Sequence, residues 1–274
     1  MVKDFRVLVF GGQMNKKTNE AAALLWKAWM SGDQLDALPP MCRPHTVEEG
    51  YAVQDALVAA SNDEVAGYKI AATSKAGQAH IGIDHPISGR LLQKRMLTNG
   101  VTATLDGNFM TVAEAEFVFE FKADMPVSNT PLDWQTVMES VGALYLGIEM
   151  PSSRFAHFAS VGAPHLISET ACAHWMVLGP EVRIDWRQRD LAEHPVRVLI
   201  DGECVVEGKG ADALGDPRFA LTWQVNQLMG RGIGIKAGQI VTTGVCGKPV
   251  PVAAGNHVVA DFGDFGTAEV RLTA

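Results

Sequence analysis

The stretch Ala113-Glu-Ala-Glu-Phe-Val-Phe119 decides the fold of this chain, together with the apolar run Val141-Gly-Ala-Leu-Tyr-Leu-Gly-Ile148 and the Glu149 that ends it. In a strand, successive side chains point to opposite faces, so Glu114 and Glu116 share one face of the first stretch. The second stretch is apolar at nearly every position, which is typical of a strand buried on both faces. The two stretches therefore predict two strands of a β-rich core that carry three carboxylates between them.

These carboxylates fit two interpretations. The alternation of Glu114 and Glu116 alone also describes a half-exposed strand with one face in water. Glu149 favours a metal site, because a carboxylate at the end of a buried strand costs several kcal/mol unless it is paired or metal-bound. Residues two apart on a strand lie roughly 7 Å apart, close enough for two carboxylates to hold one ion. Oxygen ligands without cysteines or paired histidines favour magnesium or manganese over zinc.

The composition is that of a globular protein. Of the 274 residues, 47% are hydrophobic and 20% are charged, and both values are close to the averages of soluble proteins. No apolar run approaches the roughly 20 residues that span a bilayer. The net charge of -8 and the lack of a Lys/Arg-rich block argue against binding to nucleic acid, which needs phosphate neutralisation. We therefore expect neither a membrane nor a nucleic-acid partner, and an anionic substrate would need a bound metal or a buried lysine.

Two further features indicate a cytoplasmic protein with reduced thiols. The apolar Val7-Leu-Val-Phe10 is too short for the core of a signal peptide and has no small-residue cleavage pattern after it. The cysteines lie far apart, with no Cys-x-x-Cys pair, which disfavours both a zinc site and a disulfide framework. They are Cys42, Cys172, Cys204 and Cys246.

The beginning of the chain is predicted to be helical. Thr18 is a candidate cap for a helix over residues 19–30. Thr46-Val-Glu-Glu49 is a capping box that opens a second helix, which continues to Ser61. After Gly67 the pattern changes to short strands between Gly, Pro, Asn and Asp. The sequence thus predicts an α+β protein with a mainly helical region over residues 1–66 and a β-rich domain over residues 67–274.

The β-rich part has clear local signals. Asp201-Gly202 accepts the positive φ of a type I′ turn and predicts a hairpin over residues 196–207. Thr130 with Pro131 and Asp216 with Pro217 predict the starts of two helices. Asp264-Phe-Gly266 resembles a kinase motif, but no glycine-rich phosphate loop accompanies it, so a turn is expected.

Lys69 is the most notable cationic residue. It lies in Gly67-Tyr-Lys-Ile70, a strand-like segment, so its ammonium group is expected near a strand end. An ordinary surface lysine fits the pattern equally well, and Lys75 is interpreted as one.

An ordered set of motifs gives the chain a family resemblance. It runs from Gly67-Tyr-Lys-Ile-Ala-Ala-Thr-Ser74 and Gly82-Ile-Asp-His-Pro86, through Ala113–Phe117 and Gly147-Ile-Glu-Met-Pro-Ser-Ser-Arg154, to Gly234-Ile-Lys-Ala-Gly238 and Thr242-Thr-Gly244. In these motifs the sequence resembles the 2-keto-4-pentenoate hydratase and 2-oxo-3-hexenedioate decarboxylase family of the fumarylacetoacetate hydrolase superfamily. The resemblance covers nearly the whole chain.

The resemblance implies a fold, a site and a chemistry. The fold is a helical N-terminal part followed by a mixed β-roll of fumarylacetoacetate hydrolase type. Glu114, Glu116 and Glu149 are implied as ligands of Mg²⁺ or Mn²⁺ and Lys69 as an active-site lysine, with a pKa that burial beside a cation would lower. The substrate is implied to be a small 2-oxo or 2-hydroxydienoate acid that chelates the ion. A homo-oligomer is implied, and a complex with a related enzyme of the same pathway is an option.

Three departures from the family pattern surround the expected metal ligands. The chain has Ile87-Ser-Gly89 where an Asp-Phe-Gly-like tripeptide is expected, and Ser168-Glu-Thr-Ala-Cys172 where Ala-Asp-Asn-Ala-Ser is expected. The third departure is Glu149-Met-Pro-Ser-Ser-Arg154, where the family pattern is Glu-x-x-Asp-Ser-Arg. We therefore predict Glu169 as a proton donor in place of the missing aspartate. Substrate binding is assigned to Arg154, Cys172 and Thr243, with a structural ion pair as the alternative for Arg154.

The functional hypothesis is a metal-dependent lyase, a hydratase that adds water to a 2-hydroxy-2,4-dienoate in the catabolism of aromatic compounds. The alternatives are a 2-oxo-3-hexenedioate (4-oxalocrotonate) decarboxylase, an acylpyruvate-type C–C hydrolase, and a non-catalytic partner subunit that retains the fold and the metal.

Overall fold

The computed structural model describes the backbone of residues 4–274 and the side chains from residue 16 onward. The α-helices are α1 (Asp4–Ser31), α2 (Val47–Ser61), α3 (Lys75–His80), α4 (Trp134–Glu139), α5 (Ala163–Ser168) and α6 (Pro217–Gly230). The strands are β1 (Val65–Ala71), β2 (Ile87–Leu92), β3 (Met96–Thr98), β4 (Thr102–Thr104), β5 (Val112–Phe121), β6 (Val141–Met150), β7 (Trp175–Glu181), β8 (Pro195–Ile200), β9 (Glu203–Lys209), β10 (Ile240–Thr242), β11 (Val250–Pro251), β12 (His257–Asp261) and β13 (Thr267–Thr273). Single 3-10 turns are η1 (Gln93–Arg95), η2 (Phe158–Ser160), η3 (Trp186–Gln188), η4 (Gly210–Asp212) and η5 (Gly263–Phe265).

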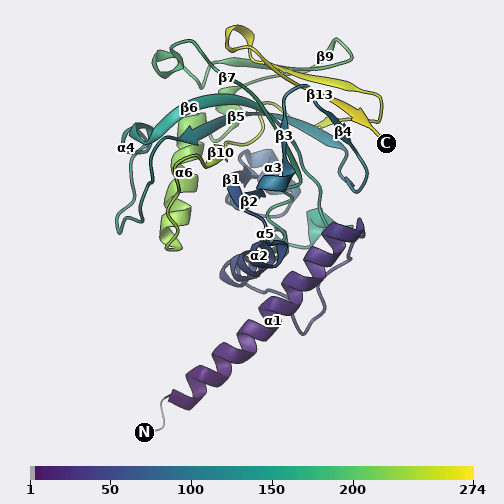
Figure 1. Ribbon diagram of the computed structural model, residues 1–274, viewed down its shortest axis with the longest axis vertical. Helices are drawn as coiled ribbons and strands as arrows, with labels where there is room; N and C mark the ends of the chain where they lie inside the picture. Colours follow the sequence, from purple (N-terminus) through teal and green to yellow (C-terminus); the bar gives the residue numbers. More distant parts are fainter. Residues whose placement is uncertain (1–3) are drawn as a thin grey trace.

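The strands form two mixed sheets (Figure 1). The larger sheet has the order β2-β1-β10-β5-β6-β7-β3, with β11 paired to β5, and the smaller has the order β4-β13-β12-β8-β9. Strands β5 and β6 are the longest, at ten residues each, and pair antiparallel at the centre of the larger sheet. The predicted α+β fold, with N-terminal helices and a curled mixed sheet, is confirmed.

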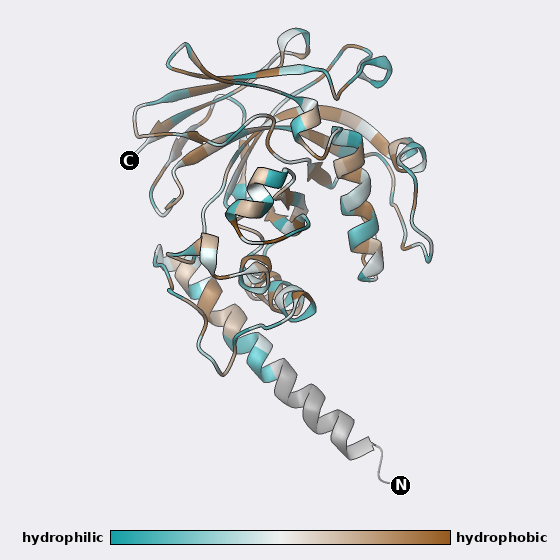
Figure 2. Ribbon diagram, turned by 180° about the vertical axis from the view of Figure 1, so that it is seen from behind, coloured by the Kyte–Doolittle hydropathy of each residue, from teal (hydrophilic) through white to brown (hydrophobic). Residues whose placement is uncertain are grey.

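The main hydrophobic core lies between the two sheets. Phe117 of β5 packs edge-on against Phe262, with ring centroids 5.0 Å apart. At the crossing of β7 and β13, a Cβ on Gly179 would lie 2.7 Å from the Cβ of Ala268, so only glycine permits this approach. In Figure 2, hydrophobic colouring follows the long central strands, whereas α6 alternates hydrophobic and hydrophilic residues. The central strands are therefore covered on both faces, as their apolar sequences require.

The helices lie on the side of the larger sheet that faces away from the smaller sheet (Figure 1). Helix α6 packs on β1 and β10, and α2 packs against both α1 and α5. Because α5 belongs to the β-rich part of the sequence, the N-terminal helices are joined to that part by direct packing. The division at residue 66 stays a prediction.

Two predicted helix starts are wrong. Helix α1 begins at Asp4, so Thr18 lies inside it. One threonine costs at most about 0.7 kcal/mol relative to alanine inside a helix, too little to end one. Helix α4 is capped by Asp133, which accepts a hydrogen bond from the Thr136 N–H at 2.8 Å. Residues 130–132 stay outside the helix, and both backbone groups of Leu132 bond to the Asn226 side chain of α6.

The other local predictions are confirmed. Thr46 caps α2 by accepting from the Glu49 N–H, although the Glu49 carboxylate reaches the His45 N–H instead of completing the box at Thr46. Asp201 and Gly202, with φ of 53° and 90°, form the β8–β9 hairpin turn. Asp216 caps α6, and Asp264 lies in the turn η5.

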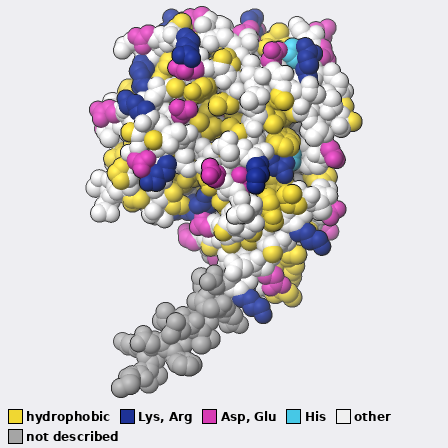
Figure 3. Space-filling model, viewed as in Figure 1, with side chains coloured by type: hydrophobic (Ala, Val, Ile, Leu, Met, Phe, Trp, Pro, Cys, Tyr) yellow, Lys and Arg dark blue, Asp and Glu magenta, His cyan; other side chains and the backbone are white. Residues whose placement is uncertain are grey.

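The helices, the surface charges and the cysteines bear on the expectations about membranes, nucleic acid and disulfides. None of the helices in the described part of the chain is both long and apolar enough to cross a membrane. The side chains of Val7–Phe10 lie outside the described ones. On the face drawn in Figure 3, acidic and basic side chains are interspersed. All four cysteines are free.

Candidate active site

The register of β5 against β6 brings the three predicted carboxylates together. Glu114 lies directly opposite Glu149, and Glu116 lies opposite Gly147. One carboxylate oxygen from each glutamate lies within 4.8 Å of the others. Like charges that face each other across a strand pair destabilise a sheet. Such an arrangement therefore calls for a compensating positive charge.

The burial of this cluster makes a compensating positive charge more necessary. Glu116 and Glu149 are fully buried, and Glu114 is half-buried at the wall of a cavity. Glu116 Oε2 accepts the Gly244 N–H at 2.8 Å, whereas Glu116 Oε1 and Glu149 Oε1 have no hydrogen-bond donor and Glu149 Oε2 faces the ammonium of Lys69. Burial raises the pKa of all three carboxyls, and the Glu149 charge adds to this at the other two, so that the pKa of Glu114 reaches about 7. Unpaired buried carboxylate oxygens fit the ligand set of a hard divalent cation.

Lys69 reaches this cluster from β1, as predicted for an active-site lysine. The side chain is buried, with its Nζ 3.2 Å from Glu149 Oε2, and it donates a hydrogen bond to the Ala171 carbonyl at 3.1 Å. The lowering of its pKa that is expected beside a bound metal ion stays a prediction, and without metal the neighbouring charges act in the other direction. Burial lowers the pKa of Lys69, but the neighbouring carboxylates, Glu149 foremost, outweigh burial and raise it above its ordinary value. Lys69 is therefore a fixed cation in this state.

An unusual turn supplies the acceptor for Lys69. Thr170, Ala171 and Cys172 have φ of 66°, 53° and 63°, a left-handed conformation that costs non-glycine residues of order 1–3 kcal/mol each. The turn is held by the Ser152 N–H, which donates to the Cys172 carbonyl at 2.9 Å. Gly89 of β2 lies against the turn, and any Cβ there would clash with the Thr170 carbonyl oxygen. The Ile87-Ser-Gly89 segment thus fits the turn closely.

Arg154 and Glu169 form a buried ion pair behind the cavity. Glu169 Oε2 lies 2.9 Å from Arg154 Nε and accepts the Arg154 backbone N–H at 2.6 Å. The guanidinium also donates to the Ala173 carbonyl and stacks over Trp29 at 4.2 Å. Neither side chain lines the cavity. The structure thus favours the ion-pair alternative for Arg154, because its guanidinium is engaged by Glu169. Substrate binding by Arg154 and proton donation by Glu169 stay predictions.

Cys172 and Thr243 differ in their access to the cavity. Cys172 lines it, and its thiol donates to Glu169 Oε1 at 3.5 Å. Burial raises the pKa of Cys172, and Glu169 adds to this, so the thiol stays neutral. Thr243 is fully buried, and its hydroxyl donates to the Phe117 carbonyl at 3.1 Å. Thr243 therefore holds the strand end that presents the Gly244 N–H to Glu116, and its role in substrate binding stays a prediction.

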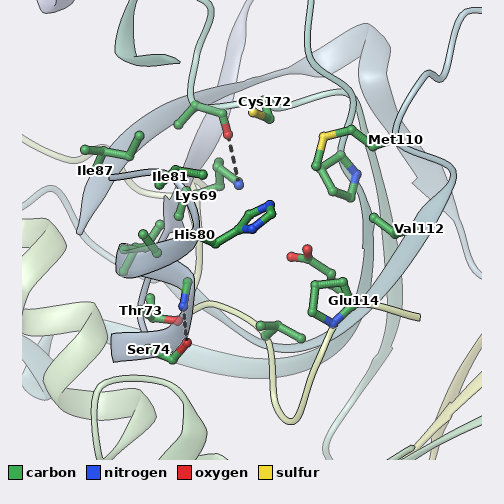
Figure 4. Close-up of a pocket in the computed structure, with 18 of the residues that line it drawn as sticks. Lys69, Thr73, Ser74, His80, Ile81, Ile87, Met110, Val112, Glu114 and Cys172 are labelled. Atoms are coloured by element: carbon green, nitrogen blue, oxygen red, sulfur yellow. Dashed lines mark hydrogen bonds between the residues drawn. The ribbon is translucent and has the colours of Figure 1, made fainter. Parts of the chain in front are cut away.

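The cavity has a volume of about 580 Å³ (Figure 4). Glu114 and Lys69 point into it from opposite sides of the view, near Cys172, and His80 reaches across it. Its apolar wall includes Ile81, Phe109, Met110 and Phe158. The sequence reasoning did not find these residues, because they come from separate loops that no periodic pattern connects.

Fold and site together define a class: an α+β protein with a curled mixed sheet whose central strands present a buried carboxylate cluster and a lysine to an apolar cavity. The family model for the C-terminal domain of fumarylacetoacetate (FAA) hydrolase matches residues 109–273. The chain belongs to this family, as the sequence motifs predicted.

The relatives cover nearly the whole chain. The 2-keto-4-pentenoate hydratase of Burkholderia vietnamiensis is 26% identical, over 92% of this chain and 96% of its own length. The 2-hydroxyhexa-2,4-dienoate hydratase of Comamonas testosteroni is 27% identical, over 91% and 95%. Among solved structures, the 4-oxalocrotonate decarboxylase from Pseudomonas putida G7, complexed with magnesium and adipate, matches with a TM-score of 0.86, covering 94% of this chain and 98% of that one. Its sequence identity of 22% supports a likeness of fold.

Proposed function

We propose that the protein is a divalent-metal-dependent hydratase that adds water to a 2-hydroxy-2,4-dienoate and gives a 4-hydroxy-2-oxo acid, in the catabolism of aromatic compounds. The observation that carries this proposal is the cluster of Glu114, Glu116 and Glu149 beside Lys69 at one end of an apolar cavity. The names of the sequence relatives that span nearly the whole chain support the same reaction.

The residues of the cluster fit Mg²⁺ or Mn²⁺. Glu116 and Glu149 each offer one buried oxygen without a donor, and Glu114 offers a carboxylate at the cavity wall. All three ligands are oxygens, which suit these hard cations. When bound, such an ion acts as a Lewis acid. It would stabilise the enolate that forms when the 2-oxo acid loses a proton from carbon.

We assign Lys69 the role of binding the negatively charged group of the substrate. Its ammonium lines the cavity while its other contacts, Glu149 and the Ala171 carbonyl, keep it in place. A fixed cation in a site shielded from water attracts a carboxylate or a developing oxyanion strongly. Lys69 is thus suited to hold the acid end of the substrate and to favour the enolate.

Cys172 and the ion pair behind it are assigned a positioning role. Glu169 accepts hydrogen bonds from Ser153, the Arg154 backbone and the Cys172 thiol. These bonds fix the left-handed turn that carries both the Ala171 carbonyl and Cys172. Arg154 and Glu169 therefore act on the reaction through the shape of this turn.

The chain is expected to work as a homo-oligomer.

Incubation of the purified protein with magnesium and 2-hydroxypenta-2,4-dienoate tests the proposal. We expect loss of the dienol absorbance and formation of 4-hydroxy-2-oxopentanoate without release of carbon dioxide. The parallel substrate is 2-oxo-3-hexenedioate. Carbon dioxide from this acid, with no hydration of the dienoate, would replace the hydratase by a decarboxylase. Turnover of neither acid would contradict both.

Magnesium affinity should depend on pH through Glu114. Without metal, the folded-state pKa of Glu114 is about 7, above its ordinary value of 4.5. Its contribution to stability is therefore present at low pH and is lost as the pH rises to about 7. Magnesium binds the ionised form, so its affinity should fall by up to about tenfold per pH unit below 7. Calorimetric titrations between pH 6 and 8 measure this, and a constant affinity would contradict it.

A further inference from the structure

The cavity is larger than the smallest substrate of the proposed reaction. 2-Hydroxypenta-2,4-dienoate has eight non-hydrogen atoms, which would fill roughly 240 Å³ if each took the volume of a liquid water, about 30 Å³. The cavity measures about 580 Å³. More than half of it would stay empty or wet around a five-carbon acid, so the volume points to a longer substrate.

The space beyond the metal cluster is lined by apolar side chains. Ile81, Met110 and Phe158 are partly buried and pack on a core cluster that includes the buried Ile87 and Leu166. They line the cavity from the end of α3, the loop before β5 and the turn η2. A concave apolar wall of this kind is typical of a site that covers an apolar ligand group.

Few polar side chains line this part of the cavity, and one of them, His80, reaches across it (Figure 4). The Ser74 hydroxyl accepts the Gly77 N–H at 3.0 Å, and the His80 ring packs on Phe158 with centroids 5.7 Å apart. Among the described residues that line the cavity, the lysines and arginines are Lys69, in the carboxylate cluster, and the exposed Lys248. A second carboxylate at the far end of a substrate would therefore lie against hydrocarbon for most of its path.

We propose that the substrate carries an apolar substituent at the end remote from its 2-oxo acid group, and that Ile81, Met110 and Phe158 bind this tail. The inference rests on the proposed function, because the carboxylate cluster and Lys69 fix which end of the substrate lies deepest. The substrate class is then a 2-hydroxy-2,4-dienoate with an alkyl or aryl extension, and a dienedioate is disfavoured.

A series of 2-hydroxy-2,4-dienoates with five, six, seven and eight carbons tests the tail site in the magnesium-loaded protein. Each added methylene should raise kcat/KM about fourfold, the effect of burying one CH₂ group. A value of kcat/KM that stays constant or falls with length would overturn the proposal. Preference for 2-hydroxyhexa-2,4-dienedioate over 2-hydroxyhexa-2,4-dienoate would overturn it as well.

A matched pair of variants locates the effect. Ile81→Asn places an amide in the apolar wall and should cut the ratio of kcat/KM between the eight-carbon and five-carbon acids by about tenfold or more. Ile184→Asn changes an isoleucine that is 42% exposed and does not line the cavity, and it should keep the wild-type ratio. An unchanged ratio in a folded Ile81→Asn protein would contradict the assignment, and its melting curve checks the fold.

Binding of unreactive 2-oxo acids separates the tail site from the reaction. 2-Oxooctanoate should bind to the magnesium-loaded protein at least about tenfold more tightly than pyruvate in a calorimetric titration. If no dienoate is turned over but this difference is found, the hydratase proposal fails and the tail site stands. Equal affinity of the two acids overturns the tail site, whatever the turnover.

Discussion

Replacement of Glu116 by glutamine should abolish magnesium binding and lower turnover on the order of 10³-fold, without destabilising the metal-free protein. A bound cation supplies several kcal/mol of stabilisation to the reacting charge, and about 4 kcal/mol corresponds to this factor. Glutamine keeps the size of the side chain and an oxygen that can accept the Gly244 N–H. It removes one ionisable carboxyl from a buried cluster in which the Glu149 charge raises the pKa of Glu114 and Glu116.

The sign of the stability change distinguishes a metal ligand from a structural residue. If Glu116 served the fold alone, Glu116→Gln would lower the melting temperature of the metal-free protein. If it is a ligand, the melting temperature should stay equal or rise, because like-charge repulsion is relieved. Glu120→Gln is the matched control, since Glu120 lies on the same face of β5 outside the cluster. Loss of magnesium binding in both variants, or in neither, would contradict the assignment.

Replacement of Lys69 by methionine should give the complementary result. We expect turnover to fall by at least about a hundredfold, the scale of one preorganised electrostatic group, while magnesium affinity is kept or increases. The ammonium lies 3.2 Å from Glu149. Among the described residues, no other cationic side chain forms an ion pair with the three carboxylates, so without Lys69 a bound metal would have to balance their charge. The melting temperature of the metal-free variant should therefore fall, and magnesium should restore it.

Lys75→Met provides the control for this experiment. Lys75 lies six residues further along and is exposed, and its Nζ donates to Gln78. Its removal should change neither the turnover nor the response to magnesium. Full activity in Lys69→Met would remove Lys69 from the mechanism, and loss of magnesium affinity would show that the lysine organises the ligands.

The gathering of the three carboxylates can be predicted from the sequence because it follows from strand periodicity. Glu114 and Glu116 share a face in any regular strand, and the apolar run before Glu149 requires a buried neighbour. What alternation does not contain is the register. That Glu114 faces Glu149 depends on how β5 and β6 align over ten residues each, and this alignment is set by the packing of the two sheets.

The backbone around the carboxylate cluster is harder to predict from the sequence. The conformation of residues 170–172 is left-handed at three consecutive positions, and neither threonine, alanine nor cysteine favours positive φ. Local hydrogen bonds, such as that from the Ala171 N–H to the Leu166 carbonyl, and tertiary contacts, among them the close fit of Gly89, hold it. Since Glu169 and Cys172 lie at the two ends of this turn, residue type alone does not predict the ion pair that Glu169 forms with Arg154.

Competing local signals explain the misplaced helix start. Thr130 with Pro131 has the residue types of a helix start, but Asp133 has an equally good capping side chain three residues later. The contact of Leu132 with Asn226, which is distant in sequence, decides between them. The apolar tail wall was missed for a similar reason, because Ile81, Met110 and Phe158 meet only in the folded chain.

The most direct test of the metal site is a crystal of the wild-type protein soaked in manganese and measured at the manganese absorption edge. The account predicts one strong anomalous peak per chain, within bonding distance of an oxygen from each of Glu114, Glu116 and Glu149, and no such peak in Glu116→Gln crystals. A wild-type map with no peak between these carboxylates, or a peak that persists unchanged in the variant, would contradict it.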